Sequence, residues 1–318
     1  MVDFFDRLYS SIVNKNVFLV KIKYYSTYRF IVRLLSNIII PFYFKLSNNN
    51  PAYKLNASFK TNKRVIVSLT SFPIRINKVW LVIESILRQK HKPDKIILWL
   101  SKDQFSSLDS LPKNLISLKK RGLEIRLCDN NIRSHKKYYY AFKEYPNDIV
   151  ITIDDDIIYS PKLLTNLILL SNDFPESICC NHASEILIEA EQLCSYVKWK
   201  SVGSKIINTN KLMPIGVGGV LYPPNSLSDN VFDIDVFSNY CFLADDIWLN
   251  IMARLKNTKV SKSSYESHYL PIMYKSNKTL NSKNVDEGLN DKQLIRTRKY
   301  CIDTWGIDPY IDLIKKKI

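Results

Sequence analysis

The stretch Ile149-Val150-Ile151-Thr152-Ile153-Asp154-Asp155-Asp156 decides the fold of this chain, because an apolar run ends there in three consecutive carboxylates. A short run rich in β-branched residues predicts a buried strand of a mostly parallel sheet, whose C-terminal end lies where open α/β sheets bind ligands. Adjacent buried carboxylates repel one another, and a divalent cation with oxygen ligands would remove that repulsion. The pattern therefore predicts a metal-dependent site for a phosphorylated substrate. A solvated acidic loop, or a helix cap before Pro161, is the alternative.

Strands and helices alternate on both sides of this stretch. We expect strands at 64–70, 95–100 and 123–128 and helices at 79–89, 134–145, 161–170 and 245–255. Such alternation predicts βαβ units, right-handed crossovers and a mostly parallel α/β sheet flanked by helices. Met213–Pro224 holds three of only seven glycines, which marks a place where the backbone bends or closely approaches a ligand.

Composition narrows the function. The 318 residues carry a net charge of +16, which makes nucleic acid, an anionic membrane face and phosphorylated substrates candidate partners. Gly-rich phosphate loops of the Walker or dinucleotide type do not occur in the sequence. Six cysteines form no CxxC pair, so the sequence indicates neither a zinc site nor a disulfide framework, and a reducing cytoplasm is expected.

The excess positive charge is concentrated near the N-terminus. Residues 1–64 contain eleven lysines and arginines against two aspartates, which accounts for nine of the sixteen net charges. Tyr28–Phe44 is apolar but is interrupted by Arg29, Arg33, Asn37 and Pro41, so a membrane span is not predicted.

We expect residues 1–60 to form a basic amphipathic segment on an anionic bilayer surface, which would place the protein peripherally on the inner face of the cytoplasmic membrane. The alternative is a helix that packs on the protein's own core with a solvated basic rim. A polar break at Ser47–Pro51 separates this segment from a catalytic domain expected over residues 61–318.

Five segments in order resemble the GT-A glycosyltransferases, the nucleotide-sugar-dependent fold that includes glycosyltransferase family 2. They are Val65–Arg75 (first strand and nucleotide loop), Val82–Leu100 (helix and second strand), Ile153–Asp156 (the DxD motif), Gly218–Val220 (an acceptor-side turn) and Ala244–Trp248 (the place of the ED motif). The second strand ends in Trp99-Leu100-Ser101, where the commonest family 2 pattern has an acidic pair.

The resemblance implies roles for the acidic residues. Asp154 and Asp156 would hold Mn²⁺ or Mg²⁺, with Asp154 facing the ribose or a metal-bound water and Asp155 binding the donor or holding a loop. Asp246 would be the general base that deprotonates the acceptor, and Asp245 would orient it or bind the acceptor sugar. The alternative is that Asp245 and Asp246 only complement a helix dipole.

Other residues are candidate donor contacts. Thr70, Ser71 and Arg75 follow the first strand and are placed to contact the nucleobase or diphosphate. Asp129 follows the third strand and would stand in for the missing second-strand acid. Lys136, with His135 and Lys137, would offer positive charge to the diphosphate. His268 is a weaker candidate for completing the metal shell. The alternative is a structural role for His268 and a surface role for each of the other residues.

The resemblance implies metal-dependent transfer of a sugar from a nucleotide-sugar, with a UDP-sugar favoured over a GDP-sugar. The acceptor would be a glycan or a lipid-linked glycan of surface polysaccharide synthesis, with inversion at the anomeric carbon. Phosphoryl or nucleotidyl transfer, or a phosphatase, could use the same Asp cluster. A non-enzymatic alternative is a basic nucleic-acid-binding protein, but the sequence shows no RNP, zinc-finger or helix-turn-helix pattern, and no nucleic-acid partner is expected.

Overall fold

A computed structural model describes residues 1–10, 17–21, 23–47, 63–265, 269–274 and 288–315. The helices are α1 (Val2–Ser10), α2 (Val17–Lys21), α3 (Tyr24–Leu46), α4 (Val79–Leu87), α5 (Lys113–Ser117), α6 (Lys136–Glu144), α7 (Leu163–Asp173), α8 (Ile234–Tyr240), α9 (Asp245–Leu255), α10 (Leu289–Trp305) and α11 (Ile311–Ile314). Short 3₁₀ turns include η4 (Arg133–His135) and η6 (Gly216–Gly218).

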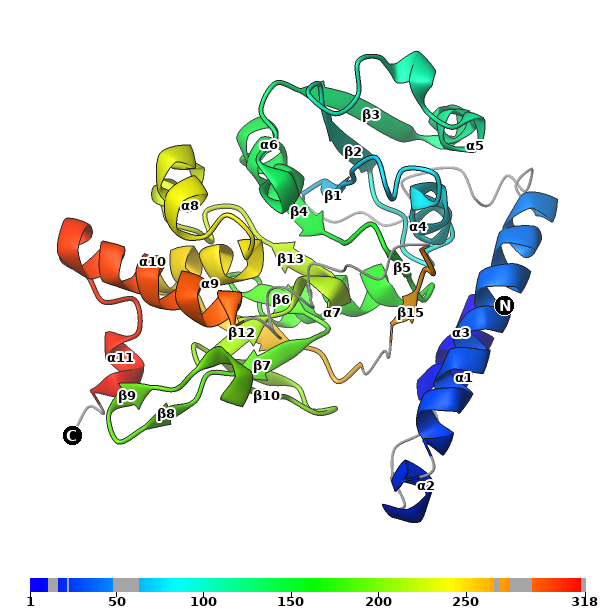
Figure 1. Cartoon of the computed structure of the whole chain (residues 1–318). Helices are drawn as coiled ribbons and strands as arrows, with labels where there is room; N and C mark the ends of the chain where they lie inside the picture. The colour runs from blue at the N-terminus through cyan, green and yellow to red at the C-terminus, as the bar shows by residue number, and fades with distance from the viewer. Residues whose placement is uncertain (11–16, 22, 48–62, 266–268, 275–287, 316–318) are drawn as a thin grey trace.

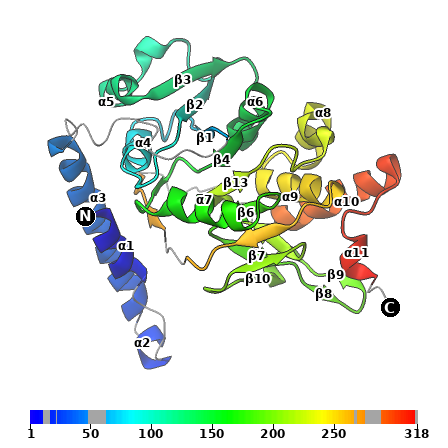
Figure 2. The same cartoon turned by 180° about the vertical axis from the view of Figure 1, so that it is seen from behind.

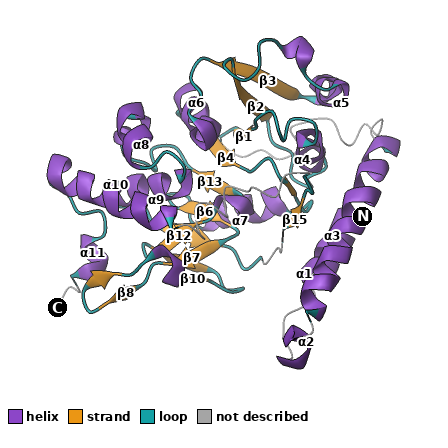
Figure 3. Ribbon diagram, viewed as in Figure 1, coloured by secondary structure: helices purple, strands orange, loops and turns teal. Residues whose placement is uncertain are grey.

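An eight-stranded sheet is the centre of the fold (Figure 3). Its strands, in spatial order, are β11 (Ile207–Thr209), β14 (Val260–Lys262), β6 (Ile178–Cys180), β13 (Val220–Tyr222), β4 (Ile149–Thr152), β1 (Val65–Thr70), β2 (Lys95–Ser101) and β3 (Leu123–Cys128). Strands β4, β1, β2 and β3 are mutually parallel, as are β14 and β6, whereas β13 runs antiparallel to both of its neighbours. The predicted α/β class, with a mostly parallel central sheet flanked by helices and preceded by a helical segment, is confirmed.

Smaller sheets complete the strand inventory. Strands β10 (Lys200–Ser201), β7 (Ala183–Glu185) and β12 (Leu212–Pro214) form one sheet, β8 (Ile188–Glu189) pairs with β9 (Gln192–Leu193), and β15 (Leu270–Pro271) pairs with β5 (Ile157–Ile158). The β5–β15 pair matters for function because β5 begins directly after the three aspartates.

Alternation along β1 explains why both faces of the sheet are covered. Val65, Val67 and Leu69 lie in one buried cluster with α4 and α7, and Ile66 lies in another with Ala141 of α6. Successive strand residues point to opposite faces, so an uninterrupted β-branched run is what a sheet covered on both sides requires. Figure 2 shows α7 and α6 on either side of the strands.

The N-terminal helices form a separate edge of the molecule. Helices α1 and α3 lie side by side beside α4, far from the C-terminus (Figure 1). Val32, Ile40 and Phe44 of α3 join the same buried cluster as α4, so one face of this helix packs on the domain. Within the part of the chain that the structure describes, no helix has the length and apolarity needed to cross a membrane. The predicted polar break extends from Ser47 into residues outside the described part.

Candidate functional site

The three aspartates lie in a turn between β4 and β5, where β4 ends next to β1 in the sheet. The backbone N–H of Asp154 donates to the hydroxyl of Tyr159, 2.9 Å away. The backbone N–H of Ile272, just past β15, donates to the carbonyl of Asp156 at 2.8 Å. The turn is therefore held by backbone contacts at both of its ends, independently of the contacts that its carboxylates make.

Lys137 joins the two acidic motifs that the sequence places ninety residues apart. Its ammonium lies 2.8 Å from Asp154 Oδ1 and 2.8 Å from Asp245 Oδ2. The side chain is almost fully buried in the first turn of α6. Burial alone would lower the pKa of Lys137, but the surrounding carboxylates outweigh it and hold the pKa well above its usual value. Lys137 is therefore a permanent cation at the centre of the site.

Arg75 organises the other side of the acidic turn. Its guanidinium contacts Asp155 Oδ1 at 2.5 Å and Asp156 Oδ2 at 2.8 Å. The hydroxyl of Ser71 donates to the second oxygen of Asp155 at 2.6 Å. Asp155 is thus bonded through both oxygens to the loop after β1, which places it in a structural role. The predicted donor contacts Ser71 and Arg75 are brought next to the acidic turn, and both bind it in this structure.

The cluster carries more negative than positive charge. Five carboxylates, those of residues 154–156, 245 and 246, meet two guanidinium or ammonium groups, those of Arg75 and Lys137. Burial raises the pKa of Asp156 to about 7, although Arg75 opposes the shift. Burial, together with repulsion from Asp245, raises the pKa of Asp246 to about 7 as well. Asp245 differs: burial would raise its pKa, but Lys137 and His135 lower it below its usual value.

This surplus of negative charge fits a divalent cation. Asp154 and Asp156 are each only partly buried, and each uses one carboxylate oxygen in an ion pair. Within the described ranges, no three His, Cys, Asp or Glu side chains are grouped as a metal cage. Mg²⁺ is commonly held by one or two carboxylates plus substrate phosphates and water, so Asp154 and Asp156 are the residues that could hold a divalent cation here.

The glycine-rich turn approaches the second acidic pair. The N–H of Gly216, in η6, donates to Asp246 Oδ2 at 2.9 Å. A Cβ at this position would lie 2.7 Å from Asp246 Oδ1 and 3.3 Å from Lys137 Nζ. Gly219 has a φ of 75°, in the region that other residues rarely adopt. The expected bend of the backbone is confirmed, whereas close approach to a ligand stays a prediction. The groups that lie against the backbone at Gly216 are acidic and basic side chains of the site.

The remaining candidate residues fall into three environments. Thr70 donates its hydroxyl to the carbonyl of Trp99 at 2.8 Å, across the β1–β2 pair. Asp129 is highly exposed and pairs with Lys102, 2.5 Å away. Lys136 is buried and donates to Asn131 at 2.8 Å, and burial lowers its pKa to about 8. Lys136 thus has no carboxylate contact within ion-pair distance among the described residues.

The expectation that His135 would offer charge to a diphosphate is wrong. The ring is fully buried, stacks on Phe237 with centroids 4.3 Å apart, and contacts the carbonyl of Cys241 at 3.0 Å. Burial lowers the pKa of His135 to about 4, so the ring is neutral at physiological pH. His268 lies outside the described residues.

A small pocket borders the acidic turn, and sequence reasoning did not anticipate it. Its lining comes from four parts of the chain, namely Tyr159, Ser160 and Leu163; Asn181 and His182; Val217 and Gly218; and Tyr265 and Tyr269. The hydroxyl of Tyr269 is buried without a hydrogen-bond partner in the described structure. Burial, with Asp154 and Asp246 nearby, raises the pKa of that hydroxyl, so it is a neutral donor beside the carboxylates. Only the glycine at 218 was a signal in the sequence.

Comparisons with known proteins give weak likenesses of fold. A scan against protein-family models finds no match, and a search of curated proteins finds none either. Among solved structures, the chain is similar to a UTP-bound UGPase from Acinetobacter baumannii (TM-score 0.41, 9% identity, 76% of this chain and 99% of that one). It is also similar to the inositol-1-phosphate CTP transferase from T. maritima (0.43, 7%, 76% and 98%) and to residues 1–349 of S. aureus TarS (0.42, 10%, 65% and 59%). These likenesses are too weak to carry a functional conclusion.

Proposed function

We propose that this protein is a metal-dependent glycosyltransferase that moves a sugar from a nucleotide-sugar to the hydroxyl of a glycan or lipid-linked acceptor. The observation that carries the proposal is the joining of two acidic motifs by the buried Lys137. One motif, Asp154 to Asp156, suits a diphosphate with its metal, and the other, Asp245 and Asp246, lies opposite it across the ammonium.

Each side chain has a task that its contacts support. Asp154 and Asp156 would hold Mn²⁺ or Mg²⁺, which neutralises the diphosphate as it leaves the anomeric carbon. Arg75 keeps the turn in place through Asp155, and the buried Lys136 supplies positive charge without a carboxylate of its own. Ser71 and Thr70 position the loop and strand end on which the nucleotide would rest.

Asp246 would act as the general base. The acceptor oxygen forms a bond to the anomeric carbon, the bond from that carbon to the diphosphate oxygen breaks, and the hydroxyl proton passes to Asp246. A base is most effective when its pKa is close to the working pH, and burial and Asp245 bring the pKa of Asp246 to about 7. The hydrogen bond from Gly216 fixes one oxygen of Asp246 and leaves the other to accept the proton. Attack opposite the leaving group gives inversion.

Nucleotidyl transfer is the second candidate, because the acidic turn would serve it equally well. Its nucleophile is a phosphate, which is already anionic at neutral pH and needs no general base. A carboxylate with a pKa of about 7 can accept the proton of a neutral hydroxyl, so the environment of Asp246 favours a hydroxyl nucleophile and therefore glycosyl transfer.

Calorimetric titration tests the donor site. UDP and GDP are titrated into the wild type and into Asp156→Ala, each with and without Mn²⁺. We expect metal-dependent binding of one nucleotide, UDP by preference, that is lost in Asp156→Ala. Binding of neither nucleotide under any metal condition would refute the donor site.

Product analysis separates the two reactions. Glycosyl transfer releases a nucleoside diphosphate from a nucleotide-sugar, whereas nucleotidyl transfer forms a nucleotide-sugar and releases pyrophosphate. Asp246→Asn should keep nucleotide binding and lose release of the nucleoside diphosphate by about 10²-fold or more. Pyrophosphate release that Asp246→Asn leaves unchanged would assign the protein to the second class.

A further inference from the structure

From Phe30 to Leu46, every exposed side chain of α3 except that of Lys45 is apolar. Its exposed side chains include eight large apolar residues, namely Phe30, Ile31, Leu34, Leu35, Ile38, Ile39, Phe42 and Leu46. Ile38, Phe42 and Leu46 are 61%, 66% and 73% exposed. We call these eight residues the α3 ridge. A contiguous apolar surface on a protein usually marks a site of association.

The α3 ridge faces outward because hydrogen bonds attach the opposite face of the helix to the domain. Arg33 and Asn37 donate to the carbonyls of Ile272 and Pro271 at 3.3 and 3.1 Å. The Asn37 side-chain oxygen accepts from the N–H of Met273 at 2.8 Å. These contacts fix the middle of the helix.

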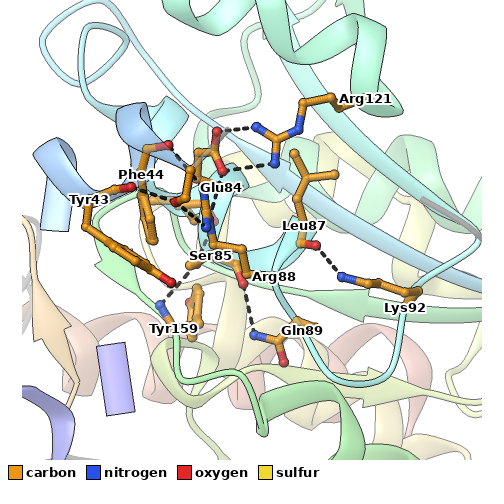
Figure 4. A network of polar contacts seen from close by, with 12 residues as sticks. Tyr43, Phe44, Glu84, Ser85, Leu87, Arg88, Gln89, Lys92, Arg121 and Tyr159 are labelled. Atoms are coloured by element: carbon orange, nitrogen blue, oxygen red, sulfur yellow. Dashed lines mark hydrogen bonds and ion pairs between the residues drawn. The ribbon is translucent and has the colours of Figure 1, made fainter. Parts of the chain in front are cut away.

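A buried network fixes its C-terminal end (Figure 4). Arg88 of α4 donates to the carbonyl of Phe44 at 3.2 Å and to the hydroxyl of Ser47 at 3.0 Å. The same guanidinium pairs with Glu84 at 3.0 Å, and Glu84 also pairs with Arg121. With α3 held at two places, its apolar ridge cannot turn inward.

Acidic and basic side chains of the N-terminal helices face different ways. The two acids of α1 face the domain: Asp3 accepts from Ser160 at 2.8 Å, and Asp6 accepts from Tyr265 at 3.2 Å. In contrast, Arg7, Lys23 and Lys45 are exposed, and the sequence of α3 contains no acidic residue. The surface beside the ridge is therefore positive.

We propose that the α3 ridge docks on an anionic phospholipid bilayer, with the helix lying in the plane of the interface. An apolar helix face beside lysine and arginine matches both the acyl boundary and the anionic headgroups. A second copy of the chain is a poorer match, because joining two ridges would bring the same cations together on molecules that each carry +16.

Docking through α3 would also fix the position of the acidic turn, because the two are connected. The segment that α3 holds, at residues 271–273, donates to the carbonyl of Asp156 through Ile272, and the hydroxyl of Tyr274 donates to the carbonyl of Asp155 at 3.3 Å. The acidic turn is thus tied to the docking helix through one short segment. This arrangement holds the site at a fixed place relative to the bilayer.

Vesicle co-sedimentation of the full chain tests the proposal. Vesicles of phosphatidylcholine alone are compared with vesicles that also contain phosphatidylglycerol, and Ile38→Glu is compared with Ile295→Glu. Ile295 of α10 is a matched control, since it is 63% exposed against 61% for Ile38. We expect the wild type and Ile295→Glu to bind the anionic vesicles, and Ile38→Glu to bind about tenfold more weakly.

A second measurement detects contact between the α3 ridge and the bilayer directly, and does not rely on a variant that binds more weakly. Phe42→Trp should gain fluorescence quenching by brominated lipid over the wild-type background. Absence of binding to anionic vesicles, equal loss in Ile38→Glu and Ile295→Glu, or no added quenching would overturn the proposal. A wild-type dimer in sedimentation that Ile38→Glu converts to monomers, without change in vesicle binding, would assign the ridge to self-association instead.

The effect of Ile38→Glu on sugar transfer is a further test, and it rests on the proposed function. Vesicle binding tests docking alone and does not rest on that function. Ile38→Glu should reduce transfer to a lipid-linked acceptor in vesicles and leave transfer to a water-soluble acceptor unchanged. Because Asp246→Asn should bind vesicles like the wild type, failure of the docking proposal and failure of the glycosyltransferase proposal are distinguishable.

Discussion

Replacing Asp246 by Asn should make the protein more stable while it lowers turnover about 10²-fold or more. The folded-state pKa of Asp246 is about 7 against an ordinary value of 3.8, because burial and Asp245 disfavour its charge. A shift of that size corresponds to about 4 kcal/mol of unfavourable free energy at alkaline pH. The neutral amide avoids this cost and retains an oxygen that can accept from Gly216. We expect Asp246→Asn to gain about 2–4 kcal/mol of unfolding free energy.

The stability gained in Asp246→Asn should increase as the pH rises. Below the unfolded pKa, Asp246 is protonated in both states and contributes nothing. As pH rises toward the folded pKa, the unfolded state loses its proton first, so wild-type stability falls and then levels off above about pH 7. Urea denaturation at about pH 5 and about pH 8 should therefore show a larger gain at the higher pH.

The neighbouring residue supplies a matched control of opposite sign. Lys137 and His135 hold the folded-state pKa of Asp245 below its usual value despite burial, so its charge stabilises the fold above that value. Asp245→Asn should cost about 1–3 kcal/mol near neutral pH, with the difference shrinking in acid as the wild-type carboxylate is protonated. If both variants shifted stability in the same direction, or if the Asp246→Asn gain were independent of pH, the electrostatic account of the site would be refuted.

Three other perturbations address the site and its support. Lys137→Gln leaves three nearby carboxylates, those of Asp154, Asp245 and Asp246, without their shared cation and should cost about 3–5 kcal/mol by urea denaturation near neutral pH. The loss should be smaller in acid, where the carboxylates are protonated, and a loss below about 1 kcal/mol near neutral pH would contradict a central cation. Gly216→Ala places a Cβ 2.7 Å from Asp246 Oδ1, so kcat should fall about tenfold or more at unchanged nucleotide affinity. An unchanged kcat would show that catalysis does not depend on the close contact between residue 216 and Asp246. Arg88→Met removes the contacts to the end of α3 and should speed proteolytic release of the N-terminal helices, whereas a wild-type cleavage rate would place their attachment elsewhere.

Local pattern was enough to predict the fold class, the four parallel strands β1 to β4 and the helices α4, α6, α7 and α9, but not the smaller strands or the other helices of the domain. The β-branched runs that became β1, β2 and β4 predict strands on their own, because a sheet covered on both faces requires apolar residues at every position. Helix α9, with acids in its first turn, was likewise evident from its periodicity. The antiparallel β13 was not predicted, since pairing direction depends on the path of the chain between strands and leaves little mark on three residues.

The sequence by itself determined which residues carry negative charge, and that three of them follow a strand while two begin a helix. It did not determine how that charge is compensated. Only the tertiary structure brings Lys137 between Asp154 and Asp245, gives Arg75 to Asp155 and Asp156, and buries His135 beyond the reach of a ligand. The physical reason is that charge compensation and desolvation depend on distances across the fold, and residues far apart in the chain leave no periodic signal of their proximity.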